Sequence, residues 1–180
     1  MRSNPKDFKT SPTRRAVLLS AAAFLLAPRV NAAEDQVVTV YKDLRCGCCT
    51  IWMRHFEKNG FVTRAVNITN VDAIKSQFGV PSELATCHTA QVGGYVIEGH
   101  VPAAAIKRLL LERPNATGLG VPGMPAGSPG MESGRPERYD VVLFGPSERR
   151  IYMSFFGEQQ LWFDAARRGY RAPMEPNTRR

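Results

Sequence analysis

The sequence predicts a mixed α/β fold whose elements follow the order β-α-β-α-β-β-α. A β-branched run is followed at once by apolar residues at helical spacing, and the same pair of patterns recurs between residues 61 and 78. Two short apolar runs then meet at a Gly-Gly pair before a third amphipathic segment. The 148 residues after position 32 suffice for one domain with its own core.

The first strand is expected at 37–41, which reads VVTVY. From Cys49 onward the apolar residues Trp52, Met53 and Phe56 recur at helical spacing, and Asn59-Gly60 provides a stop. Three of the four cysteines therefore lie in the turn between a strand and a helix.

A second strand is expected at 61–68 and a short helix at 71–78, ended by Gly79-Val80-Pro81. The segment 89–97 reads as two strands that meet near Gly93-Gly94. The last predicted helix covers 102–112, with Pro102 in its first turn. This order of elements is the thioredoxin-like arrangement.

The periodicity stops after Pro114. Ten of the 19 residues from 118 to 136 are Gly or Pro, so neither a helix nor a strand is expected to run through them. A loop as long as 113–137 is usually a functional lid or a disordered segment. The runs 138–144 and 149–155 then predict a C-terminal hairpin that turns at Gly145-Pro146 and extends the sheet.

Residues 1–32 have the pattern of an export signal peptide. Arg14-Arg15 precede the apolar stretch 16–27, and small residues at 30–32 fit a cleavage site. The stretch is too short to span a bilayer, which takes roughly 20 residues, so no stable membrane anchor is expected. Thr13 to Leu18 matches the twin-arginine motif in part, and both that route and the general secretory route stay open. The predicted location is the periplasm.

The mature domain is then expected to span 33–160, followed by a basic tail at 161–180. Six of the 24 basic and one of the 16 acidic side chains belong to residues 1–32, which leaves a net charge of +3. The high pI is thus mostly a property of the signal, and nucleic acid is not expected as a partner. The tail is interpreted as a solvated end.

The cysteine turn predicts metal or thiol chemistry. At a helix N-terminus the backbone N–H groups and the helix dipole favour a negative sulfur, and Lys42 and Arg45 add positive charge. Cys46 and Cys49 alone would form a C-x-x-C redox pair. Adjacent Cys48 and Cys49 point about 100° apart on a helix, so they suit bridging several metal ions better than binding one.

The fourth cysteine stands in Thr86-Cys87-His88-Thr89, just before the third strand. In a thioredoxin-like fold this loop faces the cysteine turn, so Cys87 and His88 are expected to join the site. Four thiolates and an imidazole form a soft, nitrogen-containing set that suits copper.

Several alternatives remain open. The four cysteines could form two disulfides, as is common in exported proteins, or hold a [2Fe–2S] cluster. His55 and His100 are left outside the predicted site. His55, six residues beyond Cys49 on the helix, is interpreted as a surface or packing residue. For His100, capping or solvent exposure is as good an explanation as ligation. Met124 and Met131 in the long loop could supply weak soft ligands or simply fill apolar gaps.

The motifs together resemble an exported family long described as a domain of unknown function, which includes the CopG-type copper-resistance proteins. The resemblance covers about residues 37–144. It rests on the Cys46–Cys49 motif with Trp52, on the segments 79–81, 87–90 and 94–103, and on Val121-Pro-Gly-Met-Pro125. It implies a thioredoxin-like fold and copper ligation by Cys46, Cys48, Cys49 and Cys87, with His88.

The predicted function is a periplasmic copper-binding protein for copper resistance or homeostasis. It would hold Cu(I), more than one ion per chain, in a thiolate-bridged site, and cycling between Cu(I) and Cu(II) would make it an oxidoreductase. Expected partners are copper ions and other periplasmic copper-handling proteins. A periplasmic thiol–disulfide oxidoreductase using Cys46 and Cys49 is the first alternative, and an iron–sulfur protein is the second.

Overall fold

The computed structural model describes residues 36–146 and 148–161. The predicted export signal and residues 162–180 of the predicted tail lie outside this range. The described helices and strands, in chain order, are β1 (Val37–Lys42), α2 (Gly47–Lys58), β2 (Val62–Asn67), α3 (Val71–Gln77), the 3₁₀ turn η3 (Ser82–Leu84), β3 (His88–Val92), β4 (Tyr95–Glu98), α4 (Ala103–Glu112), β5 (Gly118–Gly120), β6 (Arg138–Phe144), β7 (Arg149–Phe156) and β8 (Gln159–Leu161).

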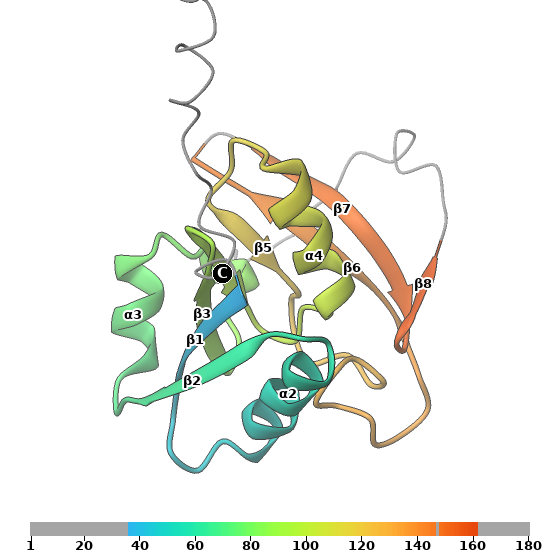
Figure 1. Ribbon diagram of the computed structural model, residues 1–180, viewed down its shortest axis with the longest axis horizontal. Helices are drawn as coiled ribbons and strands as arrows, with labels where there is room; N and C mark the ends of the chain where they lie inside the picture. The colour runs from blue at the N-terminus through green and yellow to red at the C-terminus, as the bar shows by residue number, and fades with distance from the viewer. Residues whose placement is uncertain (1–35, 147, 162–180) are drawn as a thin grey trace, which may run out of the picture. The chain divides into compact units, whose positions relative to one another are not determined.

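The described strands form a single mixed sheet in the order β2-β1-β3-β4-β5-β6-β7-β8 (Figure 1). β1 and β2 are parallel, as a helical crossover through α2 requires, whereas β1 with β3 and β3 with β4 are antiparallel. The mixed α/β class and the order of the first seven elements are as predicted.

Helices cover both faces of the sheet. Trp52 and Phe56 of α2 and Ile106 and Leu109 of α4 belong to one buried cluster, together with alternate strand residues such as Val40. On the other face a smaller cluster of Leu84, Val96, Val142 and Phe144 packs against Phe78 and Val80, which follow α3. The period-2 alternation of β4 and β6 thus divides their apolar residues between the two clusters.

The helix that carries the cysteines begins at Gly47, two residues before the Cys49 from which its apolar spacing starts. Asn59 caps its end and Gly60 follows with φ +89°, a conformation that favours glycine. The predicted Asn-Gly stop is therefore confirmed. The C-terminal hairpin is confirmed as well, since β6 pairs with β7 in antiparallel register.

The expectation that no strand runs through 118–136 is wrong at its first three residues. Gly118–Gly120 form β5, which pairs with β4 and β6 and joins the hairpin to the rest of the sheet. A Cβ at Gly118 would collide with the backbone of Val96. Glycine here permits a close approach of two strands instead of breaking the strand.

Among the described residues, no helix is long and apolar enough to cross a membrane.

Candidate metal centre

The cysteine motif forms the first turn of α2. Cys46 is the N-cap residue, and its sulfur accepts a hydrogen bond from the backbone N–H of Cys49 at 3.3 Å. Cys46 and Cys49 are joined by a disulfide, while Cys48 carries a free thiol. Of the two predicted cationic neighbours, Lys42 is buried and donates to the Asp43 carbonyl, whereas Arg45 is exposed and pairs with the Asp43 carboxylate.

The sheet brings Cys87 to this turn although 38 residues separate it from Cys49. His88, the first residue of β3, lies opposite Lys42, the last residue of β1, in the antiparallel register. Cys87, directly before β3, therefore lies at the same end of these two strands as the cysteine turn that follows β1. This is the juxtaposition that the sequence predicted.

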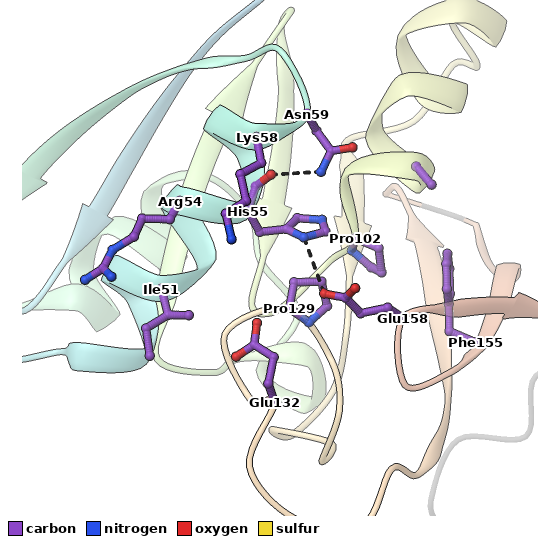
Figure 2. A pocket seen from close by; sticks show the side chains of 11 residues that line it. Ile51, Arg54, His55, Lys58, Asn59, Pro102, Pro129, Glu132, Phe155 and Glu158 are labelled. Atoms are coloured by element: carbon purple, nitrogen blue, oxygen red, sulfur yellow. Dashed lines mark hydrogen bonds and ion pairs between the residues drawn. The ribbon is translucent and has the colours of Figure 1, made fainter.

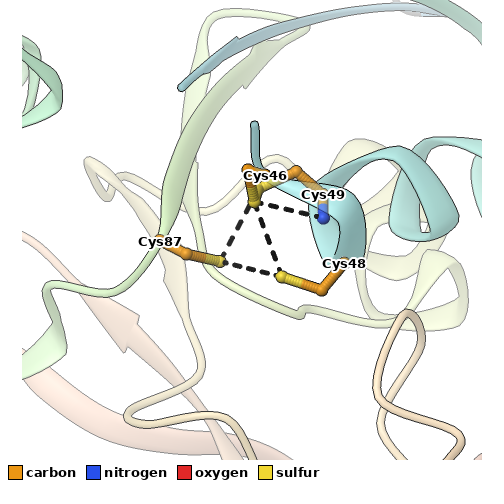
Figure 3. A group of neighbouring side chains, drawn as sticks. All are labelled: Cys46, Cys48, Cys49 and Cys87. Carbon is orange, nitrogen blue, oxygen red and sulfur yellow. Dashed lines mark hydrogen bonds between the residues drawn. A yellow bond between two sulfur atoms is a disulfide. The ribbon is translucent and has the colours of Figure 1, made fainter. Parts of the chain in front are cut away.

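The four sulfur atoms form one group (Figure 3). Cys48 Sγ lies 3.5 Å from Cys46 Sγ and 3.9 Å from Cys87 Sγ, and Cys49 Sγ lies 3.8 Å from Cys87 Sγ. Cys49 is buried, and the other three are partly exposed at the rim. On reduction of the disulfide, four thiols would face one another across distances that a soft metal ion can bridge.

Two imidazoles extend the group on the other side of Cys87. The Cys87 sulfur lies 3.3 Å from His88 Nδ1 and 3.3 Å from His100 Nε2. Both rings are fully buried, and they contact each other edge to face at 5.2 Å. Cys87 is thus shared between a sulfur group and a Cys87–His88–His100 group.

Burial keeps both imidazoles neutral, which is the form that ligates a metal. Desolvation lowers the pKa of His88 well below its ordinary value, with the neighbouring His100 as the next cause, and it also lowers the pKa of His100. Burial, with a contribution from Cys48, raises the pKa of the Cys87 thiol to about 12. A metal ion bound at Cys87 would have to displace this proton.

The tautomer of His100 is fixed by the Gly/Pro loop. His100 Nδ1 lies 2.7 Å from the Pro129 carbonyl, which can only accept, so Nδ1 carries the proton and Nε2 directs its lone pair at Cys87. Gly130 packs so closely that a Cβ would lie 2.8 Å from the Cys48 carbonyl and 3.0 Å from His100 Nδ1. The predicted long loop therefore packs directly against the centre.

Trp52 packs against the His88 ring of the centre. Its Nε1 donates to the Val101 carbonyl at 3.0 Å, and its ring packs against His88 at 4.5 Å between centroids. His88 Nε2 is buried without a hydrogen-bond partner. The other ring nitrogen, Nδ1, is the one that lies beside the Cys87 sulfur. A buried imidazole with one nitrogen at a thiol and the other unsatisfied, within a set of sulfur and imidazole donors, fits a soft metal such as Cu(I).

Sequence reasoning left out His100, although a signal for it existed. The predicted turn at Gly93-Gly94 pairs Val92 with Tyr95, and continuing this hairpin register outward sets residue 100 opposite residue 87. Met124, one of the two methionines left open, has half of its surface exposed.

His55 lies apart from both ligand groups. Its Nε2 accepts from the Ala103 N–H at 3.2 Å, and its Nδ1 lies 3.7 Å from Glu158. His55 lines a cleft of about 440 Å³. Figure 2 shows Arg54 and Lys58 on one side of His55 and Glu132 and Glu158 on the other. The packing role that the sequence analysis preferred for His55 agrees with these contacts.

Comparison with known proteins gives the family. Residues 84–131 match the family described as "Protein of unknown function, DUF411". Two solved structures of copper resistance protein copG, Form 2 and Form 1, are each 42% identical, with TM-scores of 0.63 and 0.64. The matches cover 66% and 69% of this chain and 97% and 100% of those chains. Among curated proteins none matches.

Fold and site define a mixed α/β protein with a cysteine–histidine cluster built on a C-x-C-C helix start. The chain belongs to the DUF411 family of CopG-type proteins.

Proposed function

We propose that this protein binds copper in copper resistance or homeostasis, and that it holds Cu(I) in a thiolate-bridged site with more than one ion per chain. The observation that carries the proposal is the convergence of all four cysteine sulfurs and two buried imidazoles around Cys87. The similarity to copper resistance protein copG over nearly the whole length of that protein supports a copper-related role.

The ligands we assign are Cys46, Cys48, Cys49, Cys87 and His88, to which the geometry adds His100. Sulfur and imidazole donors select soft and borderline ions, and Cu(I) accepts two or three of them. A single ion could not reach all six donors in good geometry, because Cys48 and Cys49 diverge around the helix. Bridging thiolates resolve this by sharing each sulfur between ions.

The periplasm is the compartment we propose. The export signal expected at residues 1–32 supports it, and a Cys46–Cys49 disulfide is compatible with an oxidising compartment. N-terminal sequencing and fractionation of cells that express the full chain would test this point. Recovery of the uncleaved chain in the cytoplasm would contradict it.

The test of copper binding is elemental analysis of protein purified anaerobically from copper-supplemented cells, beside a free-thiol count on the same sample. We expect more than one copper per chain in the wild type and a loss of at least one ion in Cys87→Ser. His88→Gln should weaken Cu(I) binding, whereas His55→Gln is the matched histidine control outside both ligand groups. Absence of copper from the reduced wild type would overturn the proposal.

A thiol–disulfide oxidoreductase is the second candidate, and the Cys46–Cys49 disulfide favours it. This function needs only that pair, so Cys87→Ser would keep full activity in a disulfide-reduction assay. A metal-free protein that cycles the Cys46–Cys49 disulfide reversibly would establish it. Strong visible absorption from bound iron in fresh protein would point instead to the iron–sulfur alternative.

A further inference from the structure

A buried ion pair lies directly behind the Cys87–His88 segment. Lys75 Nζ of α3 is 2.6 Å from Glu98 Oε1 at the end of β4. The Lys75 side chain is only 6% exposed and the Glu98 side chain is fully buried. Charges are almost never buried this completely unless they are paired and hydrogen-bonded, and these two groups are both.

The pair holds the residues on both sides of the ligand segment. Glu98 Oε1 accepts from the Thr86 backbone N–H at 2.6 Å and from the Thr86 hydroxyl at 3.1 Å, while Oε2 accepts from the Thr89 hydroxyl at 2.6 Å. Lys75 Nζ donates to the same Thr89 hydroxyl at 3.1 Å. Thr86 and Thr89 immediately flank Cys87 and His88.

Glu98 is also joined through the backbone to the third ligand. His100 follows it by two residues, and the Gly99 N–H between them donates to the His88 carbonyl at 3.1 Å. A Cβ at Gly99 would lie 2.5 Å from the Thr86 hydroxyl, so the two segments are in close contact. One buried carboxylate thus connects the segment of Cys87 and His88 to the segment of His100.

We propose that the Lys75–Glu98 pair is a positioning element that fixes Cys87 and His88 against His100 for copper binding. The role of the pair in copper binding rests on the proposed function. The positioning of Cys87 and His88 by the pair concerns metal-free protein as well. The hydrogen bonds of the two charged groups join them to each other and to the two threonines, and the pair acts through these threonines. A hydrophobic pair of the same volume could fill the space but could not supply the acceptors that Thr86 and Thr89 need.

The test on loaded protein compares three variants in the reduced, Cu(I)-bound state by X-ray absorption spectroscopy. Glu98→Gln leaves the Lys75 charge unpaired. Lys75→Met with Glu98→Gln removes both charges but keeps an amide that can serve both threonines. Leu109→Ala, in the core of α4, is the control for loss of stability alone, and all variants are measured well below their unfolding midpoints.

We expect Glu98→Gln to lose at least half of the imidazole scattering while it still binds copper through sulfur. The double variant should recover the wild-type ratio of nitrogen to sulfur ligands, and Leu109→Ala should retain it. A wild-type ratio in Glu98→Gln would overturn the proposal, and so would an equal loss in Leu109→Ala.

The test on metal-free protein uses Thr89→Val, which changes no charge. With the Cys46–Cys49 disulfide intact, only Cys48 and Cys87 react with iodoacetamide, and peptide mass spectrometry separates them. We expect the alkylation rate of Cys87 relative to Cys48 to rise about fivefold or more. An unchanged ratio would overturn the positioning role whether or not the wild type binds copper, so failure of this inference and failure of the proposed function are distinguishable.

Discussion

Gly130→Ala should weaken copper binding although Gly130 is not itself one of the assigned ligands. The residue has φ +88°, and a Cβ there would lie 2.8 Å from the Cys48 carbonyl, 3.0 Å from His100 Nδ1 and 3.1 Å from the Trp52 backbone nitrogen. All three atoms lie in the packed centre, so the loop must move outward. That movement would break the bond from His100 Nδ1 to the Pro129 carbonyl.

The magnitude follows from two contributions. A side chain at positive φ costs about 1–2 kcal/mol of folding free energy. Loss of the His100–Pro129 hydrogen bond adds about 1 kcal/mol, for a total of about 2–3 kcal/mol. The same bond fixes the tautomer that directs Nε2 at Cys87, and loss of such a partner typically weakens metal binding by about 10–100-fold.

Gly134→Ala is the matched control in the same loop. Its φ is +102°, but the nearest atom to its Cβ would be the Ala126 Cβ at 3.8 Å, an ordinary contact. It should therefore lose the same 1–2 kcal/mol of backbone stability and keep wild-type copper affinity. Urea unfolding of metal-free protein gives the stabilities, and competition with a Cu(I) chelator gives the affinities. Equal copper affinities for the two variants would refute the reasoning.

Three further predictions concern the centre. Cys48→Ser should bind at least one copper fewer per chain by elemental analysis, and unchanged stoichiometry and affinity would contradict bridging. Trp52→Phe removes the donor to the buried Val101 carbonyl and should cost about 1–3 kcal/mol in urea unfolding. Burial lowers the pKa values of His55, His88 and His100, so the unfolded state binds more protons than the folded state. The free energy of unfolding of metal-free protein should therefore fall as pH falls from 7 to 5. The loss is at most about 1.4 kcal/mol per pH unit for each histidine. Flat urea midpoints over this range would contradict it.

The fold was predictable because its early elements depend on local patterns. The β-branched run before the cysteines and the helical spacing of Trp52 and Phe56 identify β1 and α2. A strand that follows a helical crossover pairs in parallel with the strand before it, as β2 does with β1. The meeting of Cys87 with the cysteine turn then follows from topology alone. Even His100 lay within reach, because a tight hairpin at Gly93-Gly94 determines which residues face each other beyond its ends.

What could not be predicted depends on contacts between distant segments. Glycine in the loop reads as a breaker, yet Gly118 allows a strand to approach the Val96 backbone and Gly130 allows the loop to reach Cys48. The Lys75–Glu98 pair was equally hidden, since Lys75 looks like an ordinary surface residue on a short helix. Composition describes how a segment can bend, whereas its partner is decided by the packing of the whole chain.

The disulfide and the proposed copper site compete for the same atoms, and this competition separates the two leading functions. Cys46 and Cys49 can either be joined to each other or ligate a metal, but a thiol–disulfide enzyme has no use for the groups around them. Here Cys48, Cys87 and two neutral imidazoles remain within contact distance even when the disulfide is formed. Burying two imidazoles beside a thiol costs desolvation that a simple C-x-x-C enzyme need not incur. The arrangement around Cys87 is therefore the stronger argument for metal binding, and the phenotype of Cys87→Ser decides between them.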